Sequence, residues 1–233
     1  MPELPEVETV RAALEPVISG QTIKSVRLTR GDLRWPLPEN LDKRLLGKCC
    51  SVPKRRSKYI LIDLSDKKTL LIHLGMSGAI RLYDKMPNFA KHDHFSVELT
   101  SGQWFVFSDP RRFGHLDLFP SAFTHTHPLL SGLGVEPLSE AFTDILLTSI
   151  MKGRKAPIKS ALLDQRLIAG LGNIYVSEAL FRAGISPRRK AGTIAGQRAQ
   201  RLTKAIKTVL TEAIDAGGTS LRDHIQPGGD IGY

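Results

Sequence analysis

The chain has 233 residues, of which 41% are hydrophobic and 24% charged, so its composition argues against a disordered or fibrous protein. Its 33 lysines and arginines exceed its 23 acidic residues, giving a formal net charge of +10. This excess favours a polyanionic partner such as nucleic acid, although ribosomal and membrane-surface proteins share it. No apolar run is long enough to span a membrane, and the N-terminus is acidic where a signal peptide would be basic, so we expect a cytoplasmic protein.

The first half of the chain is predicted to be rich in strands. Apolar residues at helical spacing, such as Val7, Val10 and Leu14, predict one helix over 5–19, with Gly20 just beyond its end. Short β-branched stretches follow, separated by polar turns, and they predict strands over 23–28, 59–64, 69–74, 95–99, 104–107 and 115–119. Several short strands without intervening helices favour a sandwich or a barrel.

Helical patterns replace the strands after Pro128. Residues 129–134 have the composition of a linker, and helices are predicted over 139–151, 156–163, 176–183 and 194–216. From Gly217 onward the chain is rich in glycine and proline and is predicted to form a loop. We therefore expect a domain boundary near Pro128.

The two cysteines are adjacent in sequence, at Cys49 and Cys50. This arrangement suits neither a disulfide framework nor a four-ligand zinc site. We interpret both as strand residues.

The N-terminus carries the most distinctive chemistry. Initiator methionine is normally removed before a small residue, so the mature chain would expose Pro2 as a secondary amine. An α-amino group titrates at about pH 8 and keeps a neutral, nucleophilic fraction without deep burial. Its attack on the anomeric carbon of a sugar would give an iminium, which makes elimination of the flanking phosphates feasible. The alternative is that Pro2 and Pro5 only begin a helix.

Glu3 and Glu6 both lie near the start of the predicted helix. Carboxylates there gain about 0.3–1 kcal/mol from the helix dipole, which explains them structurally. The functional alternative is that one of them is a general acid beside the amine.

Residues 2–9, with the sequence Pro-Glu-Leu-Pro-Glu-Val-Glu-Thr, resemble the start of bacterial formamidopyrimidine-DNA glycosylase, also called 8-oxoguanine DNA glycosylase/AP lyase. The related endonuclease VIII enzymes usually have glycine at the position of Leu4. The resemblance continues, in the order of the family, through Arg-Arg-Ser-Lys-Tyr at 55–59, His-Leu-Gly-Met-Ser-Gly at 73–78, Asp-Pro-Arg-Arg-Phe-Gly at 109–114 and Gly-Leu-Gly-Asn-Ile-Tyr at 170–175. Four further matches in this order make a chance resemblance very improbable.

The resemblance implies an α+β fold: an N-terminal β-sandwich with an N-terminal helix, followed by an all-helical helix–two-turns–helix domain. Residues 1–130 would form the catalytic domain. Residues 131–233 would form the DNA-binding domain, with a lesion-capping loop resembling residues 217–223. The partner would be double-stranded DNA containing oxidised purines or abasic sites, bound by a monomer.

The resemblance also assigns catalytic roles. Pro2 would attack, Glu3 would supply protons to the opening sugar, Glu6 would organise the site, and Lys58 would hold a phosphate beside the damaged nucleotide. The structural alternative for Lys58 is that it belongs to a solvated run of charge with its basic neighbours.

Further residues would bind DNA by the same resemblance. Met76, Arg111 and Phe113 would fill the hole left by the flipped nucleotide, since inserted side chains partly replace lost stacking. His73, Lys159, Asn173 and Tyr175 would lie at the DNA backbone or near the lesion, with Asn173 in a phosphate-binding turn. Their ordinary alternatives are a satisfied strand histidine, an exposed helical lysine and a simple turn between helices.

The sequence departs from the family at its end. Full-length family members bind one zinc ion in a C-terminal four-cysteine finger, and no Cys-X-X-Cys pair occurs here. We therefore expect no cofactor in this chain and weaker DNA binding. Two rival hypotheses are a DNA-binding protein without catalysis and an endonuclease VIII type acting on oxidised pyrimidines. Leu4 and the set Met76, Arg111 and Phe113 argue against the second.

Overall fold

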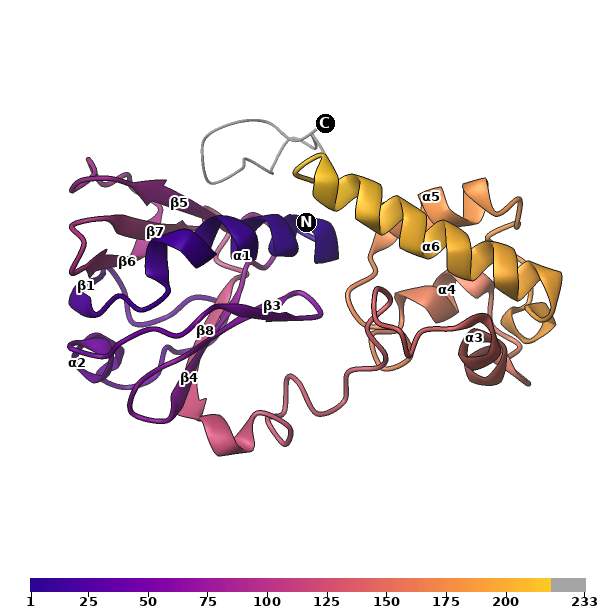
Figure 1. Ribbon diagram of the computed structural model, residues 1–233, viewed down its shortest axis with the longest axis horizontal. Helices are drawn as coiled ribbons and strands as arrows, with labels where there is room; N and C mark the ends of the chain where they lie inside the picture. Colours follow the sequence, from indigo (N-terminus) through magenta and orange to yellow (C-terminus); the bar gives the residue numbers. More distant parts are fainter. Residues whose placement is uncertain (219–233) are drawn as a thin grey trace.

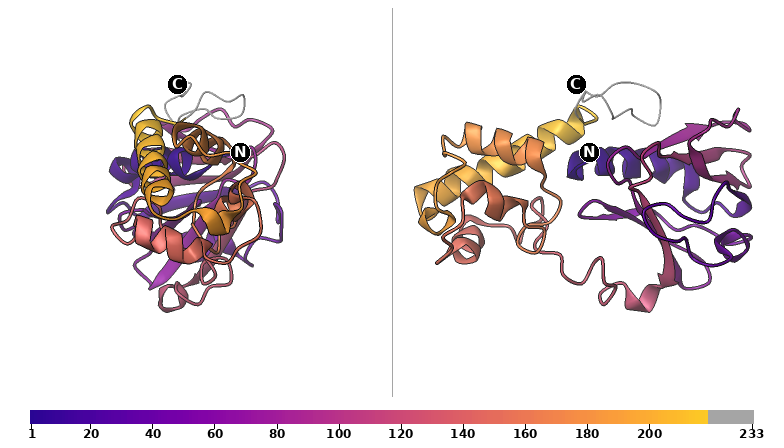
Figure 2. Two further views of the ribbon diagram at one scale, coloured as in Figure 1. Left: turned by 90° about the vertical axis from the view of Figure 1, so that its right-hand side faces the viewer. Right: turned by 180° about the vertical axis from the view of Figure 1, so that it is seen from behind.

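The computed structural model describes residues 1–218. It has a strand-rich part, containing α1 (Leu4–Ile18), and a helical part, and the N-terminus lies between the two (Figures 1 and 2). The α+β prediction is confirmed, because an N-terminal β-sandwich that begins with a helix precedes a bundle of helices.

The sandwich consists of two four-stranded antiparallel sheets. One has the order β1 (Ile23–Leu28), β6 (Asp93–Leu99), β7 (Trp104–Ser108) and β5 (Ala79–Tyr83). The other has the order β2 (Lys54–Arg56), β3 (Tyr59–Asp63), β4 (Lys68–His73) and β8 (His115–Pro120). Alternate residues such as Phe95, Phe107, Ile60 and Ile72 point inward and form one core, as the period of two requires.

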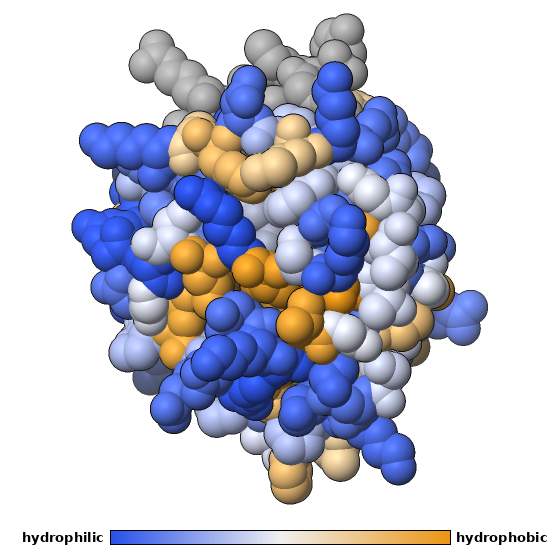
Figure 3. Space-filling view, turned by 90° about the vertical axis from the view of Figure 1, so that its left-hand side faces the viewer, coloured by the Kyte–Doolittle hydropathy of each residue, from blue (hydrophilic) through white to orange (hydrophobic). Residues whose placement is uncertain are grey.

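The connection between the two parts also packs on the sandwich. Leu130 forms a small core with Leu61, Leu71 and Phe119, which belong to β3, β4 and β8. The second sheet is therefore covered on both faces, which explains why β3 and β4 are nearly continuous apolar runs. From the end of the sandwich, mostly hydrophilic residues surround a central group of hydrophobic ones (Figure 3).

The helical part contains α3 (Asp144–Met151), α4 (Ile158–Leu163), α5 (Asn173–Arg182) and α6 (Gln197–Asp215). Its core includes Phe142, Val176, Leu202 and Ile206. Leu4 belongs to this core as well, whereas the rest of the apolar face of α1 packs on the sandwich. The first residue of α1 is therefore buried in the opposite part of the molecule.

The structure corrects several sequence-based boundaries. The helix predicted from residue 139 begins at Asp144, because the Thr143 side chain accepts a hydrogen bond from the Leu146 N–H and caps it there. The helix predicted over 176–183 begins three residues earlier, at Asn173. Cys49 and Cys50 form isolated bridges with Thr22 and Leu64 and lie in none of the named strands.

Some short elements carried too little periodicity to be predicted. These are α2 (Leu41–Leu45), β2, β5, and the two 3₁₀ turns η1 (Ser121–Phe123) and η2 (Ala191–Thr193). None of the helices in residues 1–218 has the length and apolar character needed to cross a membrane.

Phe107 is a sensitive point of the sandwich core. It is fully buried, and its ring lies directly beneath Gly78 and Gly114, where added Cβ atoms would meet it at 2.8 and 2.5 Å. We expect Phe107→Ala to lower the free energy of unfolding by about 3–5 kcal/mol, because it removes apolar contacts and leaves a cavity. Denaturant unfolding measures this change. Phe123→Ala, at a residue 57% exposed, is the matched control and should change stability by less than about 0.5 kcal/mol.

Candidate active site

Two buried carboxylates lie where the sandwich meets the helical part. Glu3 and Glu6 are each 2% exposed and stand at the start of α1. The Glu3 N–H donates to Oε2 of Glu6 at 2.8 Å, so part of the arrangement is ordinary helix capping. Pro2, the residue before the pair, is also buried.

The Glu3 side chain leaves its own helix and binds the start of another. Its Oε1 accepts a hydrogen bond from the Ile174 N–H at 3.0 Å, and its Oε2 accepts one from the Tyr175 N–H at 3.5 Å. These are first-turn amides of α5, where the helix dipole also favours negative charge. Sequence analysis predicted both glutamates as site residues but could not predict this partner 171 residues away.

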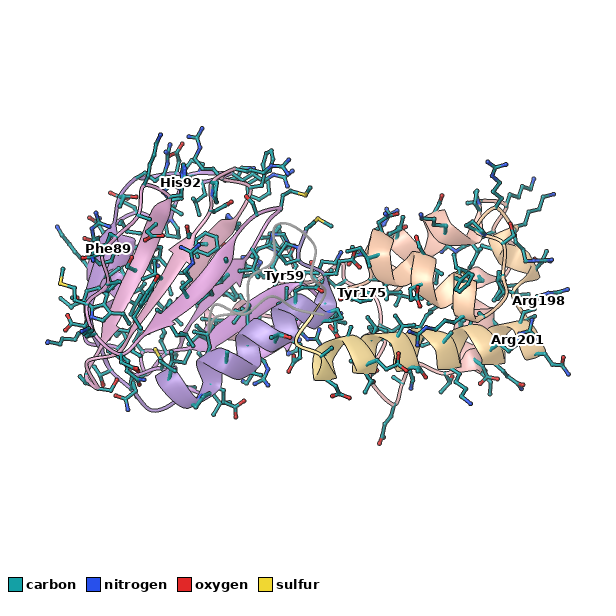
Figure 4. The ribbon with its side chains drawn as sticks, turned by 90° about the horizontal axis from the view of Figure 1, so that it is seen from above. Tyr59, Phe89, His92, Tyr175, Arg198 and Arg201 are labelled. Carbon is teal, nitrogen blue, oxygen red and sulfur yellow. The ribbon has the colours of Figure 1, made fainter. Side chains whose placement is uncertain are left out.

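Tyr175 completes the cluster. It is 3% exposed, and its hydroxyl donates a hydrogen bond to Oε1 of Glu6. In Figure 4, Tyr59 and Tyr175 lie close to the junction between the two parts. The sequence predicts Tyr175 as a DNA-binding residue, and that role stays a prediction, while the structure shows its hydroxyl bound to Glu6.

The surroundings of Glu3 alter its protonation. Burial raises the pKa of Glu3, and the nearby Glu6 charge adds to this effect. The backbone donors and the Lys58 charge act in the opposite direction but do not outweigh burial. A carboxyl group with a raised pKa is better suited to donate a proton near neutral pH.

Two glycines permit this close approach. The Leu4 N–H donates to the Gly170 carbonyl at 3.1 Å, and Gly170 has φ +89°, a conformation that side chains rarely adopt. A Cβ atom at Gly172 would lie 2.2 Å from Cδ of Glu3. The Gly-Leu-Gly-Asn turn is therefore shaped by contact with residues 3 and 4.

Lys58 lies in the tight turn between β2 and β3 and is 9% exposed. Burial lowers its pKa, although the charges of Glu3 and Glu6 act to raise it. Lys58 is therefore within electrostatic reach of both carboxylates. Its burial does not fit the alternative of a solvated run of charge, and its neighbours Arg55 and Arg56 form ion pairs with Glu136.

His73 ends β4 next to this turn. Its Nδ1 accepts a hydrogen bond from the Gly75 N–H at 3.1 Å, and its ring lies 4.8 Å from that of Tyr59. Burial and the charge of Lys58 lower the pKa of His73 to about 4. The ring is therefore neutral near pH 7, and Nε2 carries the proton as a hydrogen-bond donor.

Met76, Arg111 and Phe113 come from two loops that pack together. A Cβ at Gly75, whose φ is +67°, would lie 2.3 Å from the carbonyl carbon of Phe113. The Arg111 guanidinium lies 5.1 Å from the centre of the Phe113 ring. Phe113 is 41% exposed, Arg111 is exposed and Met76 is half-buried. All three residues are thus gathered at one edge of the sandwich.

Asp109 holds these loops in place. Its carboxylate is fully buried and accepts hydrogen bonds from Ser77 Oγ and the Gly114 N–H, both at 2.7 Å. Ser77 Oγ in turn accepts one from the Arg111 N–H at 3.2 Å. One buried carboxylate therefore links the turn of Met76 to the loop of Arg111 and Phe113.

Asn173 and Lys159 lie on the helical part. Asn173 is exposed at the first position of α5 and lines a hollow of about 710 Å³ between α5 and α6. Lys159 lies in α4 and lines a separate hollow of about 490 Å³ with Ser177 and Phe181. Unlike Lys58, Lys159 is not among the charges that shift the pKa of Glu3.

The sequence also leads us to expect a capping loop at residues 217–223 and no metal cofactor. Of residues 217–223, the expected capping loop, all but Gly217 and Gly218 lie outside the described residues. Within residues 1–218, no group of three His, Cys, Asp or Glu side chains is placed to hold a metal ion.

Comparison with known families divides the chain into two matched regions. Residues 1–116 match the formamidopyrimidine-DNA glycosylase N-terminal domain, and residues 133–224 match the formamidopyrimidine-DNA glycosylase H2TH domain. The formamidopyrimidine-DNA glycosylase of Dinoroseobacter shibae is 53% identical to this chain, and the alignment covers 100% of this chain and 85% of that protein. The protein of the same name from a Jannaschia species is 52% identical, with the same coverage.

Solved structures show the same similarity. The MutM (Fpg) protein from Thermus thermophilus has a TM-score of 0.87 and 41% identity, covering 99% of this chain and 84% of that one. Lactococcus lactis Fpg in complex with abasic-site DNA has a TM-score of 0.89 and 34% identity, covering 100% and 85%. The wild-type Lactococcus lactis protein with DNA containing N7-benzyl-Fapy-dG has a TM-score of 0.89 and 35% identity, covering 98% and 85%.

The contact between Gly172 and Glu3 can be tested by adding one methyl group. We expect Gly172→Ala to lower the free energy of unfolding by about 1–3 kcal/mol, because the added carbon overlaps the Glu3 carboxylate and the turn must shift. Thermal unfolding measures this change. Gly132→Ala is the matched control, because nothing lies within 4 Å of its Cβ position. Equal melting temperatures for the two variants would contradict the close contact.

The burial of the Glu3 charge predicts a gain in stability on neutralisation. Because the pKa of Glu3 is raised in the folded state, its favourable contribution is complete below its unfolded pKa and is lost as pH rises through the folded value. Glu3→Gln should therefore raise Tm at pH 8 by a few degrees, at about 2–4 °C per kcal/mol, and the gain should shrink toward pH 4. A gain that grows on acidification would contradict the raised pKa.

Proposed function

The chain belongs to the formamidopyrimidine-DNA glycosylase family of DNA-repair enzymes, and on that premise we propose that it removes oxidised purines from duplex DNA and then cleaves the abasic site. The substrates would be 8-oxoguanine and formamidopyrimidines. Strand cleavage would follow by β- and then δ-elimination. The observation that carries the proposal is the pair of buried carboxylates, Glu3 and Glu6, directly beside residue 2.

Pro2 is the proposed nucleophile. Once Met1 is removed, its nitrogen is a secondary amine whose lone pair forms a bond to C1′ as the bond to the damaged base breaks, with the electron pair leaving on the base. The nitrogen then gives up the proton that it carried as an amine, and this proton neutralises the departed base. Opening of the sugar converts the new bond to an iminium, while O4′ takes a proton from Glu3. The raised pKa of Glu3 supports this role, since the carboxyl retains its proton to a higher pH.

The iminium makes strand cleavage possible. It acidifies the C2′ protons, so loss of one of them expels the 3′ phosphate, and a second elimination expels the 5′ phosphate. Glu6 organises the site through its bonds to the Glu3 N–H and the Tyr175 hydroxyl. Lys58 and His73 supply donors to a phosphate next to the damaged nucleotide, Lys58 as a cation and His73 as a neutral imidazole.

Other residues would contact the DNA away from the reacting sugar. Met76, Arg111 and Phe113, gathered at one edge of the sandwich, would fill the space left by the flipped nucleotide, with Arg111 facing the orphaned cytosine. Asn173 at the start of α5 would bind a phosphate, as helix N-termini commonly do. Lys159 in α4 would contact the lesion or the DNA backbone near it.

The two parts of the chain would have different roles. Residues 1–130 would act as the catalytic domain and residues 131–233 as the DNA-binding domain of a cytoplasmic monomer. The residues present do not fit the zinc finger that the family implies, because Cys49 and Cys50 are the only cysteines in the sequence. No step of the proposed mechanism uses a metal.

Borohydride trapping tests the nucleophile directly. On a duplex with 8-oxoguanine opposite cytosine, we expect reduction to fix a covalent complex that mass spectrometry locates at residue 2. A variant extended at its N-terminus, in which the Pro2 nitrogen stays an amide, should still bind the duplex but form no complex. Pro2→Gly keeps a terminal amine and tests the need for the ring.

The outcomes separate the candidate functions. Binding of wild type without any covalent complex would leave a DNA-binding protein without catalysis. Trapping on oxidised pyrimidines in preference to 8-oxoguanine would indicate the endonuclease VIII type. A complex located at Lys58 instead of residue 2 would overturn the assignment of the nucleophile.

A further inference from the structure

Glu136 joins the Lys58 turn to the segment that leads into the helical part. Its Oε1 accepts hydrogen bonds from the Ser57 N–H at 2.6 Å and from Arg56 Nη1 at 2.7 Å. Its Oε2 accepts one from Arg55 Nη1 at 2.8 Å. One carboxylate thus binds three consecutive residues that immediately precede Lys58.

Arg55 extends the network to α1. Its Nε donates to Glu8 at 2.9 Å, and its Nη1 also donates to the Ser57 carbonyl at 2.9 Å. The Arg55 side chain is only 11% exposed. Arg55 therefore connects the helix that carries Glu3 and Glu6, the Lys58 turn and Glu136.

The turn that presents Lys58 requires external support. Ser57 has φ +56°, in the left-handed region where glycine is normally preferred. Ser57 is 1% exposed, and both of its backbone polar groups are bound, the N–H by Glu136 and the carbonyl by Arg55. The surrounding ion pairs therefore hold a conformation that the sequence of the turn does not favour.

Gln165 extends the same network to the glycine turn at 170–172. Its Oε1 accepts a hydrogen bond from the Gly170 N–H at 2.8 Å and lies 3.4 Å from Ser57 Oγ. Its Nε2 donates to the Leu171 carbonyl at 2.7 Å. The Lys58 turn and the glycine turn before Asn173 are therefore connected through a few side chains.

The chemistry of this network indicates that it fixes the geometry of the Lys58 turn and does not mainly stabilise the fold. Burial alone would raise the pKa of Glu136, but the charges and donors of Arg55, Arg56 and Ser57 lower it, so the carboxylate stays ionised. Buried ion pairs often stabilise a fold no better than apolar residues of similar volume. Apolar residues, however, could not bind the N–H of Ser57 and fix the direction of the residue that follows it.

We propose that Glu136 is a positioning residue that sets the Lys58 ammonium group for a DNA phosphate. The proposal rests on the proposed function, in which Lys58 contacts the backbone beside the lesion. Glu136 lies 78 residues from Lys58 in sequence and acts only through Ser57, Arg55 and Arg56.

The test compares Glu136→Gln, Lys58→Met and the double variant. The rate of base excision is measured in single turnover, and the affinity for a duplex with an abasic-site analogue is measured from 50 to 200 mM salt. We expect Glu136→Gln to slow excision by about tenfold or more, since small misplacements of a binding group carry large rate losses. The slope of log affinity against log salt should fall by about 1, as it does when one phosphate contact is lost.

Non-additivity is the decisive readout. If Glu136 acts through Lys58, the double variant has the same excision rate, affinity and salt slope as Lys58→Met alone. Glu140→Gln is the matched control, because it removes an exposed glutamate charge four residues away and should leave rate and salt slope unchanged. Additive losses, or a lower Tm with an unchanged salt slope, would assign Glu136 a structural role and overturn the proposal.

Two precautions keep the result interpretable. If Glu136→Gln melts below the assay temperature, Arg55→Lys tests the same link, since Arg55 also binds the Ser57 carbonyl and Glu136. The salt slope does not depend on catalysis. Wild type that binds without excising would therefore refute the proposed function, while the slopes of the variants would still decide the role of Glu136.

Discussion

The architecture depends on how two buried carboxylates at the start of α1 obtain their hydrogen bonds. Moving an ionised carboxylate out of water costs several kcal/mol of free energy unless hydrogen-bond donors of the protein replace its hydration. Those donors come from the helical part of the molecule, because the first-turn amides of α5 bind Glu3 and the Tyr175 hydroxyl binds Glu6. The sandwich and the helical part must therefore meet at this point, and Leu4 anchors the contact by entering the helical core.

The junction has two features that lower the stability of the fold. The close approach needs glycine at 172, and burial leaves Glu3 with a raised pKa. Both features reduce stability relative to an apolar junction, and they leave a carboxyl group with a raised pKa one residue from Pro2. Such a balance is common in sites where function opposes stability, and it agrees with membership of a DNA glycosylase family.

A second set of contacts holds the junction from outside. Glu136 and Gln165 bind the Lys58 turn and the glycine turn, so groups from both parts of the chain are held in a common frame. Asp109 does the same for the loops of Met76, Arg111 and Phe113. In each case a buried polar side chain orders backbone that has no regular ladder to satisfy it, which is how irregular loops acquire a defined geometry.

The sequence by itself determined the family, the order of strands before helices and most of the candidate site, because these are carried by short contiguous patterns such as residues 2–9 and 170–175. It also predicted Glu3, Glu6 and Lys58 as one site, through resemblance. Only the tertiary structure decided that Tyr175 binds Glu6, that α5 begins at Asn173 and that Glu136 supports Lys58. The physical reason is sequence separation: periodicity reports local burial, whereas a hydrogen bond between residues 79 or 169 positions apart exists only after the chain has folded.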